Sequence, residues 1–520
     1  MIAVRMSAAC GFAQGPCRWC LLRAGALAGI TSSGYFVWFL RFPMRPALYS
    51  LDQLAELVGG QIRPCAEAPS AILSVSHAAD RTRPGAACFT VDAYRRQAVR
   101  EAAKAVRKGA SCIVTSTPAV QVDVPVILVG DPTVAHQTVA CASRAAYAGK
   151  VIAITGSVGK TSTKDMMAAV LGDAGKTQAT RLNQNPLPSL TSLLASLRSD
   201  TQFLVAEVSM TQQGMIRRKA HLVQPDIAVI TAIDYSHSGN HDAEPEWVLD
   251  EKLSILDGLT SEGVAVVSSQ GPHAGAIRDA ALKAASRVIS CGDLDTDDLR
   301  MIALDDMPGG SLVTIRFEGK VHKYLVGQAG RHLARNSLLC AAAAIAAGAD
   351  PAHLGALSRY QPTPSRMQRM QVTLPGGTAF ELVDDSYNSA PASVTALLDY
   401  VATRTDATRR ILILGDMLEL GPLSPQLHEG LVAPIRAVGA DMLIAVGEQM
   451  RPVFDACGLP GFWAGTASEA AAALDGLARS GDLIAVKASN SVGLSAAVSA
   501  LRKQGVGTRP ARPDWSLSDS

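Results

Sequence analysis

The stretch Lys150-Val-Ile-Ala-Ile-Thr155, followed by Gly156-Ser157-Val158-Gly159-Lys160-Thr161, decides the fold of the central part of the chain. Its first half predicts a buried strand, and Thr161 to Ala174 predicts the helix after it. A glycine-rich loop between the two presents backbone N–H groups to an anion at the helix N-terminus. The sequence therefore predicts a phosphate site, with Lys160 supplying charge and the Thr161 hydroxyl available to Mg²⁺.

This interpretation has an alternative, because the loop is shorter between its glycines than the general nucleotide-binding pattern. An ordinary glycine-rich turn between a strand and a helix needs no ligand. We favour the phosphate site because Lys160 and Thr161 stand at the start of the helix, where both side chains can reach a bound phosphate.

Further strands and helices alternate downstream of the loop. Strand-like runs recur at Phe203–Glu207, Ile227–Thr231 and Gly263–Ser268, and alternation of this kind predicts a largely parallel sheet covered by helices. Between Val288 and Gly327 the pattern changes to alternating strands typical of an antiparallel flap. A helix rich in small residues, Ala334–Ala347, then ends this part of the chain.

Two further α/β units flank the central one. Before it, a helix from Leu51 and short strands predict a small domain, and after Gln361-Pro-Thr-Pro364 a second series of strands and helices predicts a Rossmann-like domain. We therefore expect an α/β fold of three domains: a small N-terminal domain at 44–145, a central domain of the P-loop type with a mostly parallel sheet at 146–360, and a Rossmann-like domain at 361–508. A polar tail follows at 509–520.

The composition of the 520 residues describes a globular protein and excludes some functions. The formal net charge is +2, and the basic residues are scattered along the sequence without a run that combines them with stacking aromatics, so we expect no nucleic-acid binding. Seven of the ten cysteines are isolated along the chain after the first twenty residues, which is typical of reduced cysteines in a cytoplasmic protein.

Residues 1–43 differ from the rest of the chain. The segment Leu21–Leu40 is apolar but interrupted by Arg23 and several serines and glycines, so it could be a weak signal anchor or a membrane helix. The other interpretation is a disordered extension, or an upstream start codon with initiation at Met44. We favour the second interpretation because the domain that follows has no need of export.

Three polar residues beyond the loop could complete a catalytic site. Glu207 ends an apolar strand, where a second metal-binding carboxylate is expected, and His237 and Lys252 follow the next strand. Each of them taken alone is more often a structural or surface residue. Their order after the loop is what makes them candidates.

Five sequence blocks follow one another along the chain: Thr155-Gly-Ser-Val-Gly-Lys-Thr161, Pro225-Asp-Ile-Ala-Val-Ile-Thr231, Gly330-Arg-His332 with Asn336, Asp384-Asp-Ser-Tyr-Asn388 with Pro391, and Gly415-Asp-Met-Leu-Glu-Leu-Gly421 with His428. In this order they resemble the Mur ligase family over about residues 50 to 500. The last two blocks point to the member that joins a UDP-linked tripeptide to a D-amino-acid dipeptide.

The resemblance implies roles for individual residues. Lys160 and Thr161 would hold the β- and γ-phosphates of ATP and Mg²⁺, and Glu207 and His237 would complete the metal sites. Lys252 aligns with a lysine that is carbamylated in the family, which makes it a metal-binding carboxylate.

The same resemblance places the nucleotide between two domains. Arg331 would reach the phosphates and Asn336 the adenine. Asp384 and Tyr387, from the third domain, would contact the ribose and the base side of ATP.

The resemblance also implies a reaction, cofactors and partners. We expect an ATP-dependent, ADP-forming ligase that activates a carboxylate as an acyl phosphate and joins it to an amine. The implied substrates are UDP-N-acetylmuramoyl-tripeptide and D-alanyl-D-alanine, in peptidoglycan precursor synthesis. The expected protein is a cytoplasmic monomer without an obligate protein partner, with ATP and Mg²⁺ as its cofactors.

Four segments depart from the family pattern, and all lie where the other two substrates are expected. They are Ser76–Arg96, Asn183–Ser189, Glu207–Thr211 and Lys487–Asn490, the last of which lacks a family arginine. Two alternatives therefore stay open: a ligase for a different carboxylate and amine, and a non-catalytic nucleotide-binding relative. We favour a working ligase, because a decayed enzyme should also have lost Lys160, Thr161 or Glu207.

Overall fold

The computed structural model describes residues 27–30, 36–39, 47–65, 71–91, 95–181, 185–210, 212–233, 246–307, 310–474, 476–503 and 506–508. The chain forms two compact units, residues Met1–Val139 and Ala140–Ser520. The structure confirms the predicted α/β fold class, with a separate, mostly parallel sheet for each of the three expected domains. The exact domain boundaries stay a prediction.

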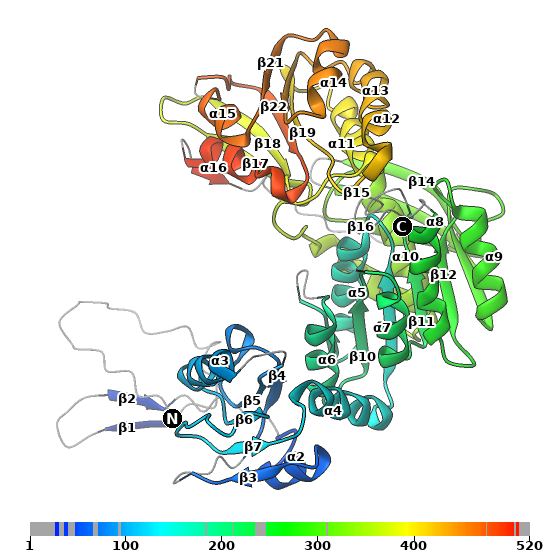
Figure 1. Ribbon diagram of the computed structural model, residues 1–520. Helices are drawn as coiled ribbons and strands as arrows, with labels where there is room; N and C mark the ends of the chain where they lie inside the picture. The colour runs from blue at the N-terminus through cyan, green and yellow to red at the C-terminus, as the bar shows by residue number, and fades with distance from the viewer. Residues whose placement is uncertain are drawn as a thin grey trace. The chain divides into compact units, whose positions relative to one another are not determined.

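The first unit is built on a five-stranded sheet (Figure 1). Its strand order is β3(Gln61–Arg63), β7(Val126–Leu128), β6(Cys112–Thr115), β5(Ala86–Phe89), β4(Ser74–Ser76), and only β3 runs antiparallel to its neighbour. The helices are α2(Leu51–Leu57), α3(Arg95–Arg107) and the start of α4(Pro132–Ala146). A capping box begins α2, in which Ser50 Oγ accepts from the Gln53 N–H and Gln53 Oε1 accepts from the Ser50 N–H.

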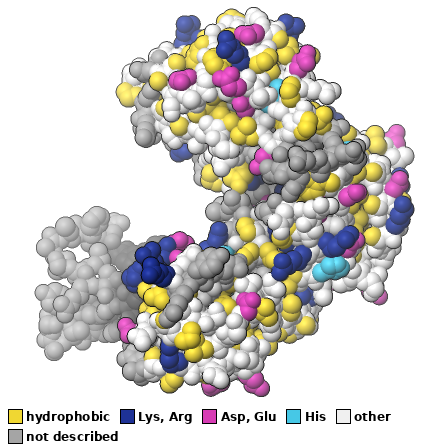
Figure 2. Space-filling model, in the orientation of Figure 1, with side chains coloured by type: hydrophobic (Ala, Val, Ile, Leu, Met, Phe, Trp, Pro, Cys, Tyr) yellow, Lys and Arg dark blue, Asp and Glu magenta, His cyan; other side chains and the backbone are white. Residues whose placement is uncertain are grey.

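Basic side chains gather on α3, contrary to the expectation that they are scattered. Figure 2 shows Lys and Arg side chains grouped over this helix. Helical spacing brings them together, because residues three and four apart share a helix face. Two of them, Lys104 and Lys108, pair with Asp80 at 2.7 and 3.4 Å.

Part of the N-terminal segment is also described. Strands β1(Leu27–Ile30) and β2(Phe36–Phe39) form an antiparallel pair. The rest of the apolar segment Leu21–Leu40 and the tail at 509–520 lie outside the described residues. Within the part of the chain that the structure describes, no helix is long and apolar enough to cross a membrane.

The second unit contains a nine-stranded sheet. The strands lie in the order β16(Lys320–Val326), β15(Gly310–Phe317), β14(Leu299–Met307), β13(Arg287–Gly292), β12(Val264–Ser268), β11(Ile227–Ile230), β8(Lys150–Thr155), β10(Phe203–Glu207), β9(Thr177–Ala179). The antiparallel flap predicted for Val288–Gly327 comprises β14 to β16, whereas β13 is parallel to β12. The predicted direction of β13 is wrong, because the sequence of a strand does not reveal which strand it pairs with.

The position of β8 explains why a site forms at its end. Its neighbours are β10 on one side and β11 on the other, so the chain leaves β8 in one direction and later returns on the opposite side. In open parallel sheets, ligands bind at the carboxyl ends of strands where the strand order reverses. The helices of this part are α5(Lys160–Ala174), α6(Leu187–Ala195), α7(Met215–Val223), α8(Glu246–Leu253), α9(Ala274–Ala284) and α10(Arg331–Ala346).

A seven-stranded sheet follows the short helix η4(Pro351–Arg359). Its order is β21(Gly461–Ala464), β20(Met442–Val446), β19(Arg409–Gly415), β22(Asp482–Lys487), β18(Ala379–Asp385), β17(Gln368–Thr373), β23(Val506–Thr508). Separate apolar cores cover its two faces, one including α11(Pro391–Thr403), α13(Val432–Ala437) and α14(Met450–Cys457), the other α15(Ala467–Ala472) and α16(Ser495–Lys503). The short helix α12(Ser424–Glu429) lies between β19 and β20 in sequence.

Candidate active site

Two glycines give the loop after β8 its shape. The φ angles of Gly156 and Gly159 are 147° and 84°, in the region that favours glycine. A Cβ atom on Gly156 would lie 1.9 Å from Thr231 Oγ1, and one on Gly159 would lie 2.5 Å from Asn336 Oδ1. Both positions therefore require glycine, for backbone conformation and for space.

The end of β11 holds the loop in place. The Ser157 N–H donates to the Ala232 carbonyl at 2.9 Å, and the Thr231 hydroxyl lies 2.6 Å from the Val158 carbonyl, to which it donates. Helix α5 starts directly after the loop, at Lys160. The first N–H groups of a helix have no partner within it, so this end of α5 is suited to an anion.

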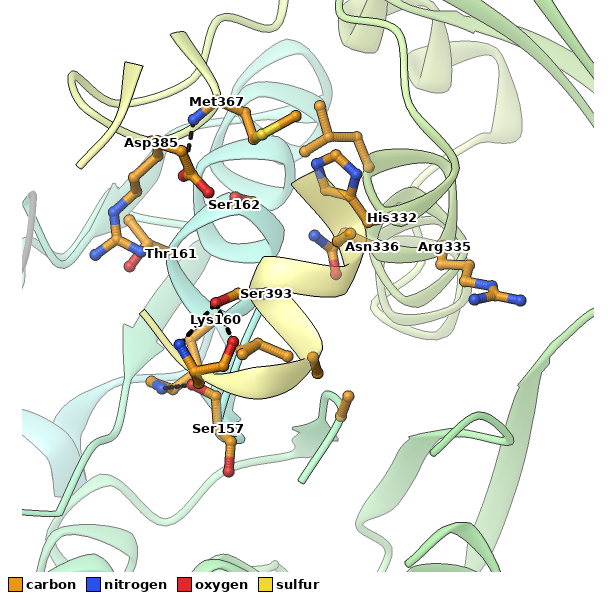
Figure 3. A pocket seen from close by; sticks show the side chains of 18 of the residues that line it. Ser157, Lys160, Thr161, Ser162, His332, Arg335, Asn336, Met367, Asp385 and Ser393 are labelled. Atoms are coloured by element: carbon orange, nitrogen blue, oxygen red, sulfur yellow. Dashed lines mark hydrogen bonds between the residues drawn. The ribbon is translucent and has the colours of Figure 1, made fainter. Parts of the chain in front are cut away.

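Lys160 stands at the start of α5, next to the loop (Figure 3). Its Nζ donates to the carbonyls of Gly156 at 2.6 Å and Ser157 at 2.8 Å. Burial lowers the pKa of Lys160 from 10.5 to about 8, with Glu207 opposing the shift and Arg366 adding to it. A bound phosphate would compensate this poorly solvated charge.

Thr161, Glu207 and Asn185 form a cluster of side-chain oxygens beside the loop. The Thr161 hydroxyl donates to Glu207 Oε2 at 2.9 Å, and the Asn185 amide donates to Glu207 Oε1 at 2.8 Å. Only 2% of Glu207 is exposed. Carboxylate and hydroxyl oxygens suit Mg²⁺, which takes one or two carboxylates and completes its shell with phosphates and water.

Lys252 on α8 reaches the same loop from another side. Its Nζ lies 3.1 Å from the Gly156 carbonyl, and only 1% of the residue is exposed. Burial holds the pKa of Lys252 well below 10.5, helped by the charge of Lys160 and opposed by Glu251. His237 lies outside the described residues, so its predicted role has no structural counterpart here.

The residues predicted on α10 lie at the cavity wall. Asn336 covers Gly159, and Figure 3 shows His332 and Asn336 on the same helix. Arg331 also lines the cavity, but its guanidinium is paired with Asp293 at 2.5 Å and its side chain is 58% exposed. A phosphate contact by Arg331 would require this pair to open.

Of the two residues predicted to contact the nucleotide from the block Asp384–Asn388, Tyr387 lies at the cavity and Asp384 does not. Tyr387 lines it, with the Arg366 guanidinium 4.1 Å above the ring. Asp384 does not line it: its oxygens accept hydrogen bonds from Ser365 and Ser386 at 2.9 and 2.7 Å. The predicted ribose contact of Asp384 stays a prediction.

An ion pair that the sequence did not predict lies beside that block. Lys487 Nζ contacts Asp385 Oδ2 at 2.5 Å and donates to the Asn388 carbonyl at 2.8 Å. Asp385 Oδ1 accepts from the Met367 N–H at 3.0 Å. Asp385 falls in a recognised block and Lys487 in a segment that departs from the family pattern, and nothing in the sequence pairs positions 385 and 487.

Residues 157–161 of the loop, Asn185 and Glu207 line one cavity of about 960 Å³ within the second unit. Lys252 and Asp384 do not line it. The loop and the oxygen cluster lie on one side, and the residues of the 385–388 and 487–490 segments on the other. This volume is in the range of small-molecule and cofactor sites. The arrangement can bind a nucleoside triphosphate with its phosphates at the loop and a divalent cation at Glu207.

Comparison with known proteins identifies the family. Residues 154–344 match the Mur ligase middle domain, and residues 365–490 match the Mur ligase, glutamate ligase domain. A UDP-N-acetylmuramoyl-tripeptide–D-alanyl-D-alanine ligase from Synechocystis sp. is 31% identical over 418 residues, which are 76% of this chain and 85% of that protein. The chain belongs to the Mur ligase family.

Solved Mur ligase structures share this fold. The structure of MurF from Acinetobacter baumannii has a TM-score of 0.75 at 24% identity and covers 88% of this chain and 99% of its own. MurF from Thermotoga maritima in complex with ADP has a TM-score of 0.68 at 19% identity, covering 83% and 97%. Mur ligases are ATP-dependent, ADP-forming ligases, so this activity and the need for ATP are assigned to the chain.

Proposed function

We propose that the protein joins UDP-N-acetylmuramoyl-tripeptide to D-alanyl-D-alanine in peptidoglycan precursor synthesis. The observation that carries the proposal is the similarity to ligases with this name over most of the chain, together with a cavity lined by both the glycine-rich loop and the Glu207 carboxylate. We further propose that it acts as a cytoplasmic monomer of three domains, at 44–145, 146–360 and 361–508.

The loop and its neighbours would bind ATP and Mg²⁺. Lys160 and the first N–H groups of α5 would hold the phosphates, since they are the cation and the donors nearest to the loop. Thr161 and Glu207, already 2.9 Å apart, would hold Mg²⁺, which supplies charge neutralisation at the phosphoryl group. Arg331, Asn336, Asp384 and Tyr387 would contact the rest of the nucleotide.

Lys252 would act as a carbamate and His237 as a second metal ligand. The low pKa of Lys252 supports the first role, because it favours the neutral amine that can react with carbon dioxide. Mass spectrometry of the intact protein in bicarbonate buffer tests this. A Lys252→Arg variant, which cannot be carbamylated, is the control.

The cavity would protect an acyl phosphate from hydrolysis. The carboxylate of the first substrate would attack the terminal phosphorus of ATP, with ADP as the leaving group. The amine would then attack the acyl carbon and displace phosphate. Residues from both sides of the cavity, such as Lys160 and Lys487, would exclude water between these steps.

A different pair of substrates is the second candidate function. Three segments that depart from the family pattern contribute to the cavity wall, through Asn185, Ser209 and Asn490. In this candidate function these segments would contact the carboxylate and the amine. The chemistry would be the same, with another acceptor or donor.

One assay distinguishes these candidates. The protein is incubated with ATP, Mg²⁺, UDP-N-acetylmuramoyl-tripeptide and D-alanyl-D-alanine, and phosphate and the UDP-linked product are measured. Product at ordinary substrate concentrations supports the proposal, and Lys160→Ala should abolish it. Phosphate release only with other amines or carboxylates would favour the second candidate, and none with any pair would contradict both.

A further inference from the structure

Lys219, in the middle of α7, is completely buried although it carries a charge. Its ammonium donates to the carbonyl oxygens of Asn185 at 2.7 Å and Ser209 at 2.5 Å. A buried ammonium needs such partners because it has lost its hydration. The two carbonyls belong to segments far apart in sequence, so Lys219 ties these segments together.

Both segments lead directly to Glu207. The side chain of Asn185 donates to Glu207 Oε1 at 2.8 Å, and Ser209 follows Glu207 by two residues. The other oxygen, Oε2, accepts from Thr161 at 2.9 Å. A movement of either segment would therefore change the position of the Glu207 carboxylate relative to the phosphate loop.

Helix α7 is itself fixed at both ends, so Lys219 is attached to a rigid element. At its start, Glu251 accepts hydrogen bonds from the Gly214 and Ile216 N–H groups at 2.7 and 2.6 Å. At its end, Arg144 donates to the carbonyls of Val223 and Gln224, both at 2.7 Å. The ammonium can therefore impose a fixed position on the carbonyls that it binds.

We propose that Lys219 is a positioning residue for the metal site, which it serves by fixing the segments on either side of Glu207. The proposal rests on the proposed role of Glu207 as a Mg²⁺ ligand. The two bound carbonyls lie in segments that depart from the family pattern, at Asn183–Ser189 and Glu207–Thr211. The contacts of Lys219 therefore lie in parts of the chain that differ from the family pattern. Residues that orient metal ligands commonly change metal affinity by about 10- to 100-fold.

The test compares Mn²⁺ binding by wild-type protein and by Lys219→Met, with a non-hydrolysable ATP analogue present. Electron paramagnetic resonance measures free Mn²⁺. We expect the apparent Kd for Mn²⁺ to rise by about 10- to 100-fold, while the Kd for the analogue without metal changes by less than about twofold. Methionine has a similar length and no charge, so the shape of the site is largely kept.

The matched control is Arg144→Met, which removes another cation that binds two carbonyls of α7 at its far end. This variant should lower Tm but leave the Mn²⁺ affinity as in the wild type. The proposal is overturned if Lys219→Met binds Mn²⁺ like the wild type, or if Arg144→Met loses as much affinity. Glu207→Gln tests the proposed metal role of Glu207 separately from the positioning role of Lys219. If this variant binds Mn²⁺ like the wild type, Glu207 is not a metal ligand.

A second comparison applies if Lys219→Met does not fold. Lys219→Gln keeps one hydrogen-bond donor, and Asn185→Ala removes the link to Glu207. Both substitutions act through the Glu207 carboxylate. The variant that carries both should therefore bind Mn²⁺ with nearly the same Kd as the single variant of lower Mn²⁺ affinity. Losses that multiply in the double variant would show independent effects and would overturn the proposal.

Discussion

Replacing Lys160 with methionine should make the nucleotide-free protein more stable at neutral pH while abolishing its activity. The ammonium is held by two carbonyl oxygens, and burial lowers its pKa from 10.5 to about 8. A lysine whose pKa falls on folding is charged at neutral pH only at the expense of stability. The proposed role of Lys160 in phosphate binding would account for the retained charge.

The magnitude follows from the two pKa values. A fall from 10.5 to about 8 corresponds to a penalty of about 3 kcal/mol against the charged form at pH 7. The lost hydrogen bonds to Gly156 and Ser157 offset about 1 kcal/mol each. Lys160→Met should therefore raise the free energy of unfolding of this part of the protein by about 1 kcal/mol at pH 7.

The pH dependence has a defined sign. Between pH 8 and 10.5 the unfolded chain keeps the Lys160 proton that the folded protein has lost, so the stability of the wild type rises with pH in this window. The advantage of the variant is present in full below pH 8 and disappears as the pH rises toward 10.5. Near pH 10 the wild type should be the more stable protein.

Urea unfolding at pH 7 and pH 10 without nucleotide measures the stability difference, and phosphate release measures activity. Lys176→Met is a suitable control, because Lys176 is an exposed lysine paired with Asp200 at 2.7 Å. A destabilised Lys160→Met at pH 7, or a stability difference that does not change with pH, would refute the reasoning. Residual phosphate release near the wild-type rate would refute the catalytic role.

Three further predictions concern the loop, the metal and the C-terminal sheet. Gly159→Ala should raise the KM for ATP roughly tenfold, which corresponds to about 1.4 kcal/mol of strain. The strain arises because Gly159 has a φ of 84° and a Cβ atom there would meet Asn336. An unchanged KM in steady-state kinetics would contradict this prediction. Glu207→Gln should raise the Mg²⁺ concentration required for phosphate release about 100-fold, and an unchanged Mg²⁺ titration would exclude it as a ligand. Glu381→Gln removes the carboxylate that pairs with Arg369 at 2.6 Å and Arg404 at 2.8 Å. It should lower the free energy of unfolding by about 2 kcal/mol with KM for ATP unchanged, as urea unfolding and kinetics can check.

Local patterns predicted the elements of this fold well. The strands Lys150–Thr155 and Phe203–Glu207 have the predicted limits, because buried parallel strands are continuous apolar runs. The helix after the loop begins at Lys160, one residue earlier than predicted. Partners across the fold were not predictable in this way, which is why β13 was expected to be antiparallel.

The site shows the same division. The loop and Glu207 were predicted because each has a local signature, and Thr161 and Glu207 line one cavity. Lys252 reaches the same loop through the Gly156 carbonyl. The contacts of Lys219 and of Lys487 were missed, because a buried lysine is recognised only when its distant partners are known. Lys219 binds backbone carbonyls, which any residue can provide. Lys487 binds a carboxylate that lies 102 positions away in the sequence.

The place of β22 in the C-terminal sheet has a consequence for synthesis of the chain. This strand, Asp482–Lys487, lies between β18 and β19, although both precede it by many residues. A ribosome must therefore complete nearly the whole polypeptide before the two halves of the sheet can join and before Lys487 can reach Asp385. A premature stop upstream of residue 482 would leave two unpaired strand edges open to aggregation, so incomplete chains should be removed rather than accumulate as partly active enzyme.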